Sequence, residues 1–258
     1  MIQDPATAGV VHYFFEWAAL AAGAATFRRI RRGRSGGGIL SSQSFPLVLG
    51  CVIGAGIGNK LVFWLEYPQL WELFKGSPLS WAMGQSIVGG LLGGWIGVEL
   101  AKKMAKISSR SGDDFILPIL TGIVVGRIGC FLAGLNDGTY GLPTALPWGI
   151  DFGDGIHRHP TQLYEWLLAL AVMLTYPRWR LAFAHEAGLG FRVFMAGYLL
   201  WRLFIDALKP LPFAYPLGLS AIQWICLLWL LGMLGARLLH ICHNGAKNTT
   251  TTLKARSP

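Results

Sequence analysis

The chain has 258 residues, of which 53% are hydrophobic and only 14% are charged. Soluble domains carry about 25% charged residues, so this composition excludes a disordered chain and disfavours an ordinary soluble domain. The formal net charge is +9. Because no base-stacking or groove-reading motif accompanies the basic residues, we expect a membrane surface and no nucleic acid as their partner. The four cysteines form no C-x-x-C pair, and we expect no metal site.

A helix needs about 20 mostly apolar residues to cross a bilayer. Seven segments approach that pattern: residues 9–27, 46–66, 80–101, 115–135, 161–177, 189–208 and 219–240. The fifth is short and contains Gln162 and Glu165. We therefore predict an all-α integral membrane protein with seven transmembrane helices. Residues 1–245 would form one membrane domain, and the threonine-rich residues 246–258 a disordered cytoplasmic tail.

Lysine and arginine are distributed unequally between the predicted loops. Fifteen follow the first, third, fifth and seventh segments, and three occur in the other loops. The three are Lys75, Arg158 and Lys209. Because short cytoplasmic loops carry the excess of positive charge, the N-terminus is predicted outside and the C-terminus in the cytoplasm.

Glycines recur four residues apart in three of the segments. The second contains Gly50, Gly54 and Gly58, the third Gly89, Gly93 and Gly97, and the fourth Gly122 and Gly126. Small residues at this spacing let helix backbones approach closely. The glycines therefore predict tight packing between helices.

Three basic residues lie inside the segments, at similar depth. Lys60, Arg127 and Arg202 are each eight or nine residues from the outer end of a segment, which is roughly 12–13 Å at about 1.5 Å per residue. Ionisable groups at such depth usually mark function. Two guanidinium groups at the same depth can bind one phosphate, because each has paired N–H donors that match two phosphate oxygens. Internal salt bridges, Lys60 with Glu16 and Arg202 with Asp206, are the alternative.

The loop between the fourth and fifth segments is long, polar and rich in turn-forming residues. Such loops are commonly functional. Asp137 begins it and His159 ends it. A histidine is suited to proton transfer near neutral pH, so His159 is either a proton-transfer residue or a structural residue held at the start of a helix by its backbone.

Two stretches of the chain resemble a known family. Gly126-Arg127-Ile128-Gly129-Cys130-Phe131, followed by Gly134 and Gly138, is similar to the G-R-I-G-N-F…G signature of bacterial prolipoprotein diacylglyceryl transferases. His159-Pro160-Thr161-Gln162-Leu163-Tyr164-Glu165 resembles the H-P-[ST]-Q-L-Y-E motif of that family. Weaker matches are Gly89–Gly93, Arg202–Asp206 and Gln223, so the resemblance runs in order from about residue 80 to 235.

The resemblance implies seven spanning helices in the bacterial inner membrane, with the N-terminus outside. It implies transfer of the diacylglyceryl group of phosphatidylglycerol to the cysteine thiol of a lipoprotein precursor, releasing glycerol phosphate, without metal or cofactor. Arg127 and Arg202 match the two arginines that hold the phospholipid. The predicted catalytic residues are Arg127, Arg202, His159 and Asp137. The predicted substrate-binding residues are Lys60, Gly126, Gly129, Cys130, Gly138, Tyr164 and Glu165.

Three family residues are replaced. The histidine before Gly89 is Val88, the asparagine of the arginine motif is Cys130, and the following acidic residue is Leu135. A thiol acceptor needs a base or a lowered thiol pKa. With Val88 in place, the base would be His159, Asp137 or Glu165. Two alternatives follow: a related enzyme with a different acceptor, or a phospholipid-binding membrane protein without catalysis. Cys130 is either a nucleophile or a packing residue.

Overall fold

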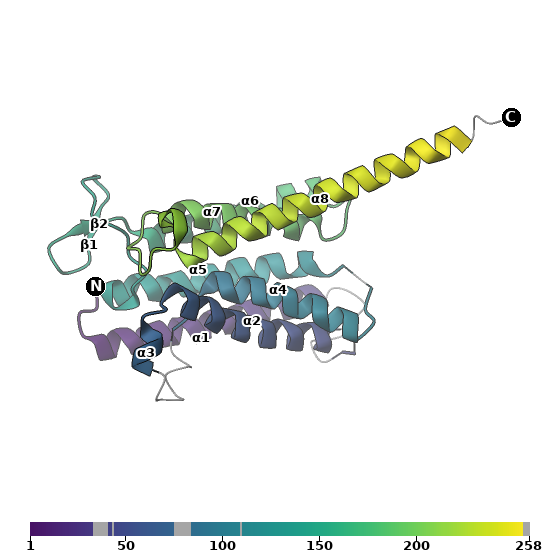
Figure 1. The fold of residues 1–258 in the computed structure, drawn as a ribbon. Helices are drawn as coiled ribbons and strands as arrows, with labels where there is room; N and C mark the ends of the chain where they lie inside the picture. The colour runs from purple at the N-terminus through teal and green to yellow at the C-terminus, as the bar shows by residue number, and fades with distance from the viewer. Residues whose placement is uncertain (33–40, 43, 75–83, 109, 255–258) are drawn as a thin grey trace.

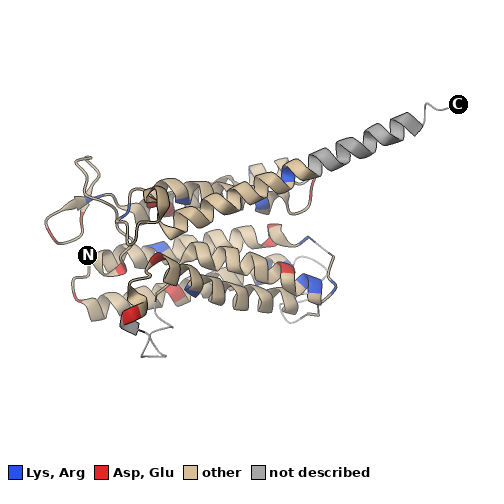
Figure 2. Cartoon of the chain, viewed as in Figure 1, with Lys and Arg blue, Asp and Glu red and all other residues tan. Residues whose placement is uncertain are grey.

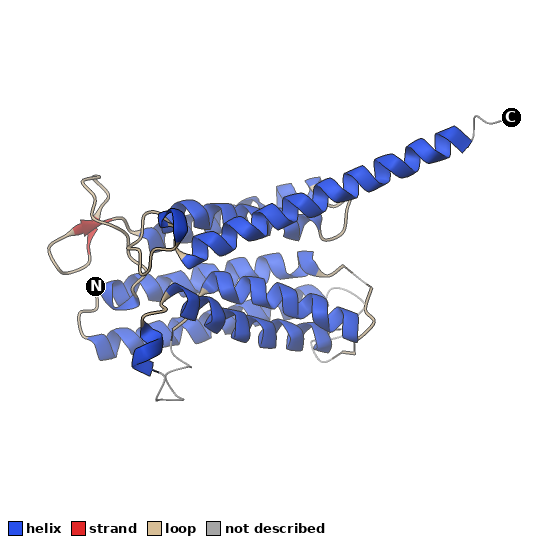
Figure 3. Ribbon diagram, in the orientation of Figure 1, coloured by secondary structure: helices blue, strands red, loops and turns tan. Residues whose placement is uncertain are grey.

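The computed structural model describes the chain except residues 33–40, 43, 75–83, 109 and 255–258, and no side chain beyond residue 239. The described part contains seven long helices (Figures 1 and 3). They are α1 (Pro5–Arg32), α2 (Phe45–Glu66), α4 (Ile87–Met104), α5 (Ile116–Ala133), α6 (Thr161–Ala182), α7 (Leu189–Asp206) and α8 (Ala221–Lys254). Short elements connect them: α3 (Leu70–Phe74), the 3-10 turns η2 (Gly112–Phe115), η3 (Gly134–Asp137) and η4 (Pro216–Gly218), and strands β1 (Ile150–Asp151) and β2 (His157–Arg158).

The all-α class is confirmed, and each predicted segment coincides with one long helix. The ends of several helices differ from the predicted bounds, and three of these differences are the clearest. Helix α4 begins at Ile87 and not at residue 80. Ser86 caps it, since its hydroxyl accepts a hydrogen bond from the Gly89 backbone N–H at 3.3 Å. Residues 80–83 of the predicted segment lie outside the described part. Helix α6 continues past residue 177 to Ala182. Helix α8 continues to Lys254, past the predicted start of the tail at residue 246.

Within the described residues, three helical stretches are long and apolar enough to cross a membrane by length and composition: Phe45–Glu66, Gly112–Asp137 and Ala221–Leu239. The other long helices carry more polar and charged residues. Helix α7, for example, has Arg192, Arg202 and Asp206 among its 18 residues. Large apolar side chains such as Trp17, Leu61 and Phe204 lie exposed on outward faces. A soluble domain would rarely leave so much apolar surface in water.

The long helices run side by side, and helix α8 ends on the side of the bundle opposite to the N-terminus (Figure 1). Helix α1 packs on α5, α2 on α4, α5 on α6, and α7 on α8. The β1–β2 hairpin lies at the end that carries the N-terminus (Figure 1). The loop before α6 is therefore placed beside the same end of α1 and α5.

The predicted glycine packing is confirmed between α2 and α4. A Cβ added to Gly54 would collide with the carbonyl oxygen of Gly93, and one added to Gly58 would collide with that of Gly89. The two backbones thus meet without side chains between them, as small residues four apart allow. Gly126 of α5 makes a looser contact, 3.6 Å from its would-be Cβ to Cβ of Ala19 in α1.

The loop before α6 contains a hairpin that the sequence did not predict. Strands β1 and β2 pair antiparallel, with Ile150 opposite Arg158 and Asp151 opposite His157. The Asp151 carboxylate accepts backbone N–H groups across the turn, including that of Gly153 at 2.7 Å. The Gly153 hydrogen bond is the main cause that lowers the pKa of Asp151 below its usual value. The acids of this loop therefore shape the turn.

Candidate active site

Two arginines converge on one buried carboxylate. Nη2 of Arg127 lies 2.6 Å from Oε2 of Glu165, and Nη1 of Arg202 lies 3.5 Å from the same oxygen. The hydroxyl of Tyr198 donates to the other oxygen, Oε1, at 2.7 Å. Only 1% of the Glu165 side chain is exposed. The guanidiniums thus come from α5 and α7 and share a partner on α6, which is what residues that bind one anion must do.

Arg202 also forms the salt bridge one helical turn along α7 that the sequence offered as the alternative to phosphate binding. Its Nε and Nη2 lie 3.0 and 2.8 Å from the two oxygens of Asp206. Nζ of Lys209 reaches the same carboxylate at 3.0 Å. We call Arg127, Glu165, Tyr198, Arg202, Asp206 and Lys209 the arginine cluster. It holds three cations and two carboxylates, so it carries a formal surplus of one positive charge.

Several buried polar atoms in and beside the arginine cluster have no hydrogen-bond partner among the described residues. They include Nε of Arg127 and both amide atoms of Gln162. Gln162 is fully buried and lies one helical turn before Glu165. Buried polar groups are nearly always hydrogen-bonded, and leaving one unpaired costs about 1–3 kcal/mol. The unmet donors and the surplus charge together suit a polar anionic ligand. The sequence motif contains Gln162, but only burial reveals its unmet hydrogen bonds.

A second group of ionisable side chains lies where α1 meets the end of α5. Nδ1 of His12 lies 2.9 Å from Oδ1 of Asp137, and the hydroxyl of Thr139 donates to the other oxygen of that carboxylate. Sγ of Cys130 lies within 4.8 Å of the ligand atoms of His12 and Asp137. We call His12, Cys130 and Asp137 the histidine cluster. Sequence reasoning missed His12, because a lone histidine on an apolar helix gives no signal until the packing of α1 on α5 is known.

Arg127 connects the two clusters. Its Nη1 donates to Sγ of Cys130 at 3.7 Å while its Nη2 contacts Glu165. The histidine cluster offers nitrogen, sulfur and oxygen atoms that could bind a metal ion. A guanidinium this close to the sulfur opposes a second cation there, so we assign no metal to it.

His159 and Tyr164 form a separate contact in the outer loop. Nδ1 of His159 lies 3.3 Å from the Tyr164 hydroxyl, which also accepts from Nε1 of Trp148 at 2.8 Å. The backbone N–H of His159 donates to the carbonyl of Leu142 at 3.1 Å. This matches the structural alternative for His159. No hydrogen bond among the described residues joins His159 or Tyr164 to either arginine.

The remaining predicted residues are scattered. Nζ of Lys60 donates to the carbonyl of Gly84 at 2.6 Å, at the start of the chain leading into α4. Gly126 and Gly129, which were predicted to bind substrate, face helix α1 instead, where Ala19 and the Phe15 side chain lie against them. Gly138 has a φ of +69° and faces open space where η3 ends.

The position at which the family has a histidine is buried in the apolar core of this chain. Val88 has no exposed surface and belongs to the apolar core with Leu92, Leu120 and Leu199. Its side chain has no group that can bind or release a proton. Any proton transfer in this chain must therefore come from elsewhere.

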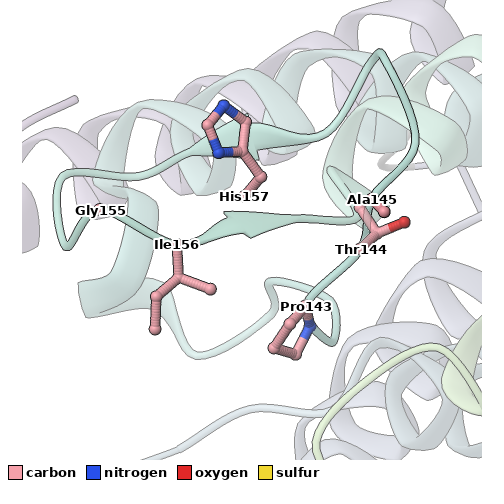
Figure 4. Close-up of a pocket in the computed structure, with 6 residues that line it drawn as sticks. All are labelled: Pro143, Thr144, Ala145, Gly155, Ile156 and His157. Carbon is pink, nitrogen blue, oxygen red and sulfur yellow. The ribbon is translucent and has the colours of Figure 1, made fainter.

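A hollow of about 460 Å³ lies in the outer loop. Pro143, Thr144, Ala145, Gly155, Ile156 and His157 line it. Figure 4 shows the ring of His157 and the side chain of Ile156 on opposite sides of the hairpin. The hollow contains no residue of either cluster, and we assign it no catalytic role.

Comparison with known proteins gives a consistent result. The model of the prolipoprotein diacylglyceryl transferase family matches residues 13–244. A phosphatidylglycerol–prolipoprotein diacylglyceryl transferase of Bordetella parapertussis is 32% identical over 197 residues, 72% of each chain. Proteins of the same name from Nitrosospira multiformis and Nitratidesulfovibrio vulgaris are 31% and 30% identical, covering 77% and 76% of this chain and 71% and 74% of their own. His12 lies one residue before the family match begins.

Proposed function

Because the chain belongs to the prolipoprotein diacylglyceryl transferase family, we propose that it transfers the diacylglyceryl group of phosphatidylglycerol to the cysteine thiol of a lipoprotein precursor. The observation that carries this proposal is the convergence of Arg127 and Arg202 on one anionic group in a cluster with surplus positive charge. A lipid phosphate offers the same arginines the paired oxygens that a guanidinium fork prefers.

The reaction places its new charge on the phosphate. The acceptor sulfur forms a bond to the glyceryl carbon as the bond from that carbon to the phosphate oxygen breaks. The electron pair leaves with glycerol phosphate, which gains a negative charge as a phosphomonoester. Arg127 and Arg202 would stabilise this charge as it develops. Removing one such donor from an enzyme typically costs about 10²–10³ in kcat.

The proposed placement is the bacterial inner membrane, with seven spanning helices, the N-terminus outside and the C-terminus in the cytoplasm. The N-terminus and the end of helix α8 lie on opposite sides of the bundle in Figure 1, which supports an odd number of spans. Basic residues fill the last turns of α1, α4 and α6, which end on the side away from the N-terminus (Figure 2). A single membrane domain over residues 1–245 follows from this placement. Residues 246–258 would extend into the cytoplasm.

We assign the proposed site roles by position. Arg127 and Arg202 hold and neutralise the phosphate, with Glu165 orienting both. Cys130 lies against Arg127, where it would contact the glyceryl group. Tyr164, His159 and Gly138 belong to the outer loop, where the peptide would enter, and Lys60 would meet the lipid from α2.

The direct test is a transfer assay in which the purified protein is incubated with headgroup-labelled phosphatidylglycerol and a peptide that carries a lipoprotein cysteine motif. We expect lipidated peptide and free glycerol phosphate in equal amounts. Headgroup release without lipidated peptide would indicate a different acceptor. Saturable lipid binding without either product would indicate a phospholipid-binding protein instead of an enzyme.

A further inference from the structure

The proposed reaction needs a group that takes the proton from the acceptor thiol, because the thiolate is the nucleophile. Val88, buried in the apolar core, cannot accept a proton. Glu165 is already held by Arg127, Arg202 and the Tyr198 hydroxyl, which stabilise its unprotonated form and occupy its oxygens. The arginine cluster therefore contains no free base.

The histidine cluster places an imidazole against a buried carboxylate. Nδ1 of His12 lies 2.9 Å from a carboxylate oxygen of Asp137. The contact has the distance of an ion pair but not the angle of a hydrogen bond. A carboxylate only accepts hydrogen bonds, so a small turn of the ring would let Nδ1 donate to it and would leave the lone pair on Nε2. The Thr139 hydroxyl holds the second oxygen of Asp137. This is the relation between base and orienting acid that serves thiol and hydroxyl nucleophiles in other enzymes.

His12 is also accessible. Of the His12 side chain 30% is exposed, against 3% of the Asp137 side chain. The orienting acid is therefore protected, and the imidazole can be reached by a second substrate. Around it lie Asp137 on η3, Cys130 and Arg127 on α5, and Glu16 one turn along α1.

Arg127 sets the distance between base and phosphate. One of its terminal nitrogens faces Glu165, where the phosphate would bind, and the other faces Cys130 in the histidine cluster. A phosphate held by Arg127 would place the adjacent glyceryl carbon toward His12. Sγ of Cys130 already occupies the space between Arg127 and His12, so the acceptor sulfur would approach His12 from its exposed side.

We propose that His12, oriented by Asp137, is the catalytic base that removes the proton of the acceptor thiol. The proton moves from sulfur to His12, the sulfur bonds to the glyceryl carbon, and the carbon–oxygen bond to phosphate breaks. The imidazolium then returns the proton to the released glycerol phosphate or to water. Asp137 acts through His12 and is a positioning residue. This inference rests on the proposed diacylglyceryl transfer.

The test uses the full-length chain in lipid nanodiscs that contain phosphatidylglycerol, with the acceptor peptide. For His12→Gln we expect kcat to fall at least about 100-fold, the usual contribution of general base catalysis, with the KM for phosphatidylglycerol unchanged within about threefold. Imidazole added to His12→Ala should restore part of the rate. For Asp137→Asn we expect a smaller loss, and Asp137→Glu should retain more activity than Asp137→Asn. The matched control is His185→Gln, because His185 is exposed in the loop before α7.

The outcomes separate this inference from the function on which it rests. If the wild-type protein shows no diacylglyceryl transfer, both the proposed function and the proposed role of His12 are wrong. An active wild type with an unaffected His12→Gln variant overturns the inference alone. The inference is also overturned if the His12 variants lose activity with a raised KM and imidazole does not restore it. That result would indicate a structural role for His12. A diacylglyceryl adduct found by mass spectrometry on Cys130 in place of the peptide would also overturn the inference.

Discussion

The arginine cluster and the histidine cluster share Arg127 but differ in access. The side chains of Arg127, Arg202 and Glu165 are 8%, 5% and 1% exposed, and their charges are paired with each other. His12, in contrast, is 30% exposed beside a buried carboxylate. The comparison indicates a division of labour. In this account the phosphate binds to buried, paired charged side chains, whereas the acceptor thiol approaches from the exposed side of His12.

Removing the residue common to both clusters should have the largest effect. Arg127→Ala takes away the link between phosphate and base, and we expect kcat/KM for transfer to fall about 10³-fold or more. Initial rates with labelled phosphatidylglycerol measure this. Arg178→Ala is the matched control, because Arg178 is exposed on α6. Equal rates for both variants would contradict a role for Arg127 in either cluster.

Neutralising the buried carboxylate should separate stability from catalysis. Glu165→Gln leaves two buried guanidiniums without their shared anion, and breaking such a pair typically costs about 3–5 kcal/mol. We expect a lower thermal unfolding temperature that phosphatidylglycerol partly restores and phosphatidylcholine restores less. Equal protection by both lipids would show that the arginine cluster does not bind an anionic headgroup.

The α2–α4 interface provides a change remote from both clusters. Gly54→Ala forces a methyl group against the Gly93 carbonyl, and overpacking of this kind costs about 1–3 kcal/mol. Gly56→Ala on the same helix is the control, because nothing lies within 4 Å of its would-be Cβ. We expect thermal unfolding to shift for Gly54→Ala only. Equal shifts would mean that helix propensity, and not packing, sets the result.

The smallest effect is expected at the loop between α6 and α7. Glu186 accepts from Arg192 and also contacts Arg110 and Arg237. The Arg192 hydrogen bond is the main cause that lowers the pKa of Glu186 to about 2. Because the folded pKa lies below the unfolded value of about 4.3, this stabilisation is complete above pH of about 4.3 and is lost as the pH falls toward 2. Glu186→Gln should lower the unfolding temperature slightly at neutral pH, and less in high salt. A shift that salt does not change would contradict an electrostatic origin.

The sequence predicts the parts of this molecule that depend on local pattern. Long apolar runs place all seven helices, and ionisable residues within them identify Arg127 and Arg202. It does not predict that Glu165 is their common partner, because that depends on how α5, α6 and α7 cross. The sequence also does not predict the contact of His12 with Asp137, because that contact depends on the packing of α1 on α5. The packing of α1 on α5 also places Phe15 against Gly129, a predicted substrate-binding residue.

The most direct measurement is a structure of the protein in nanodiscs with phosphatidylglycerol bound. We predict that the lipid phosphate lies within hydrogen-bonding distance of both Arg127 and Arg202, with its glyceryl carbon on the side of His12. A headgroup bound elsewhere, with both arginines still engaged only by Glu165 and Asp206, would contradict the account.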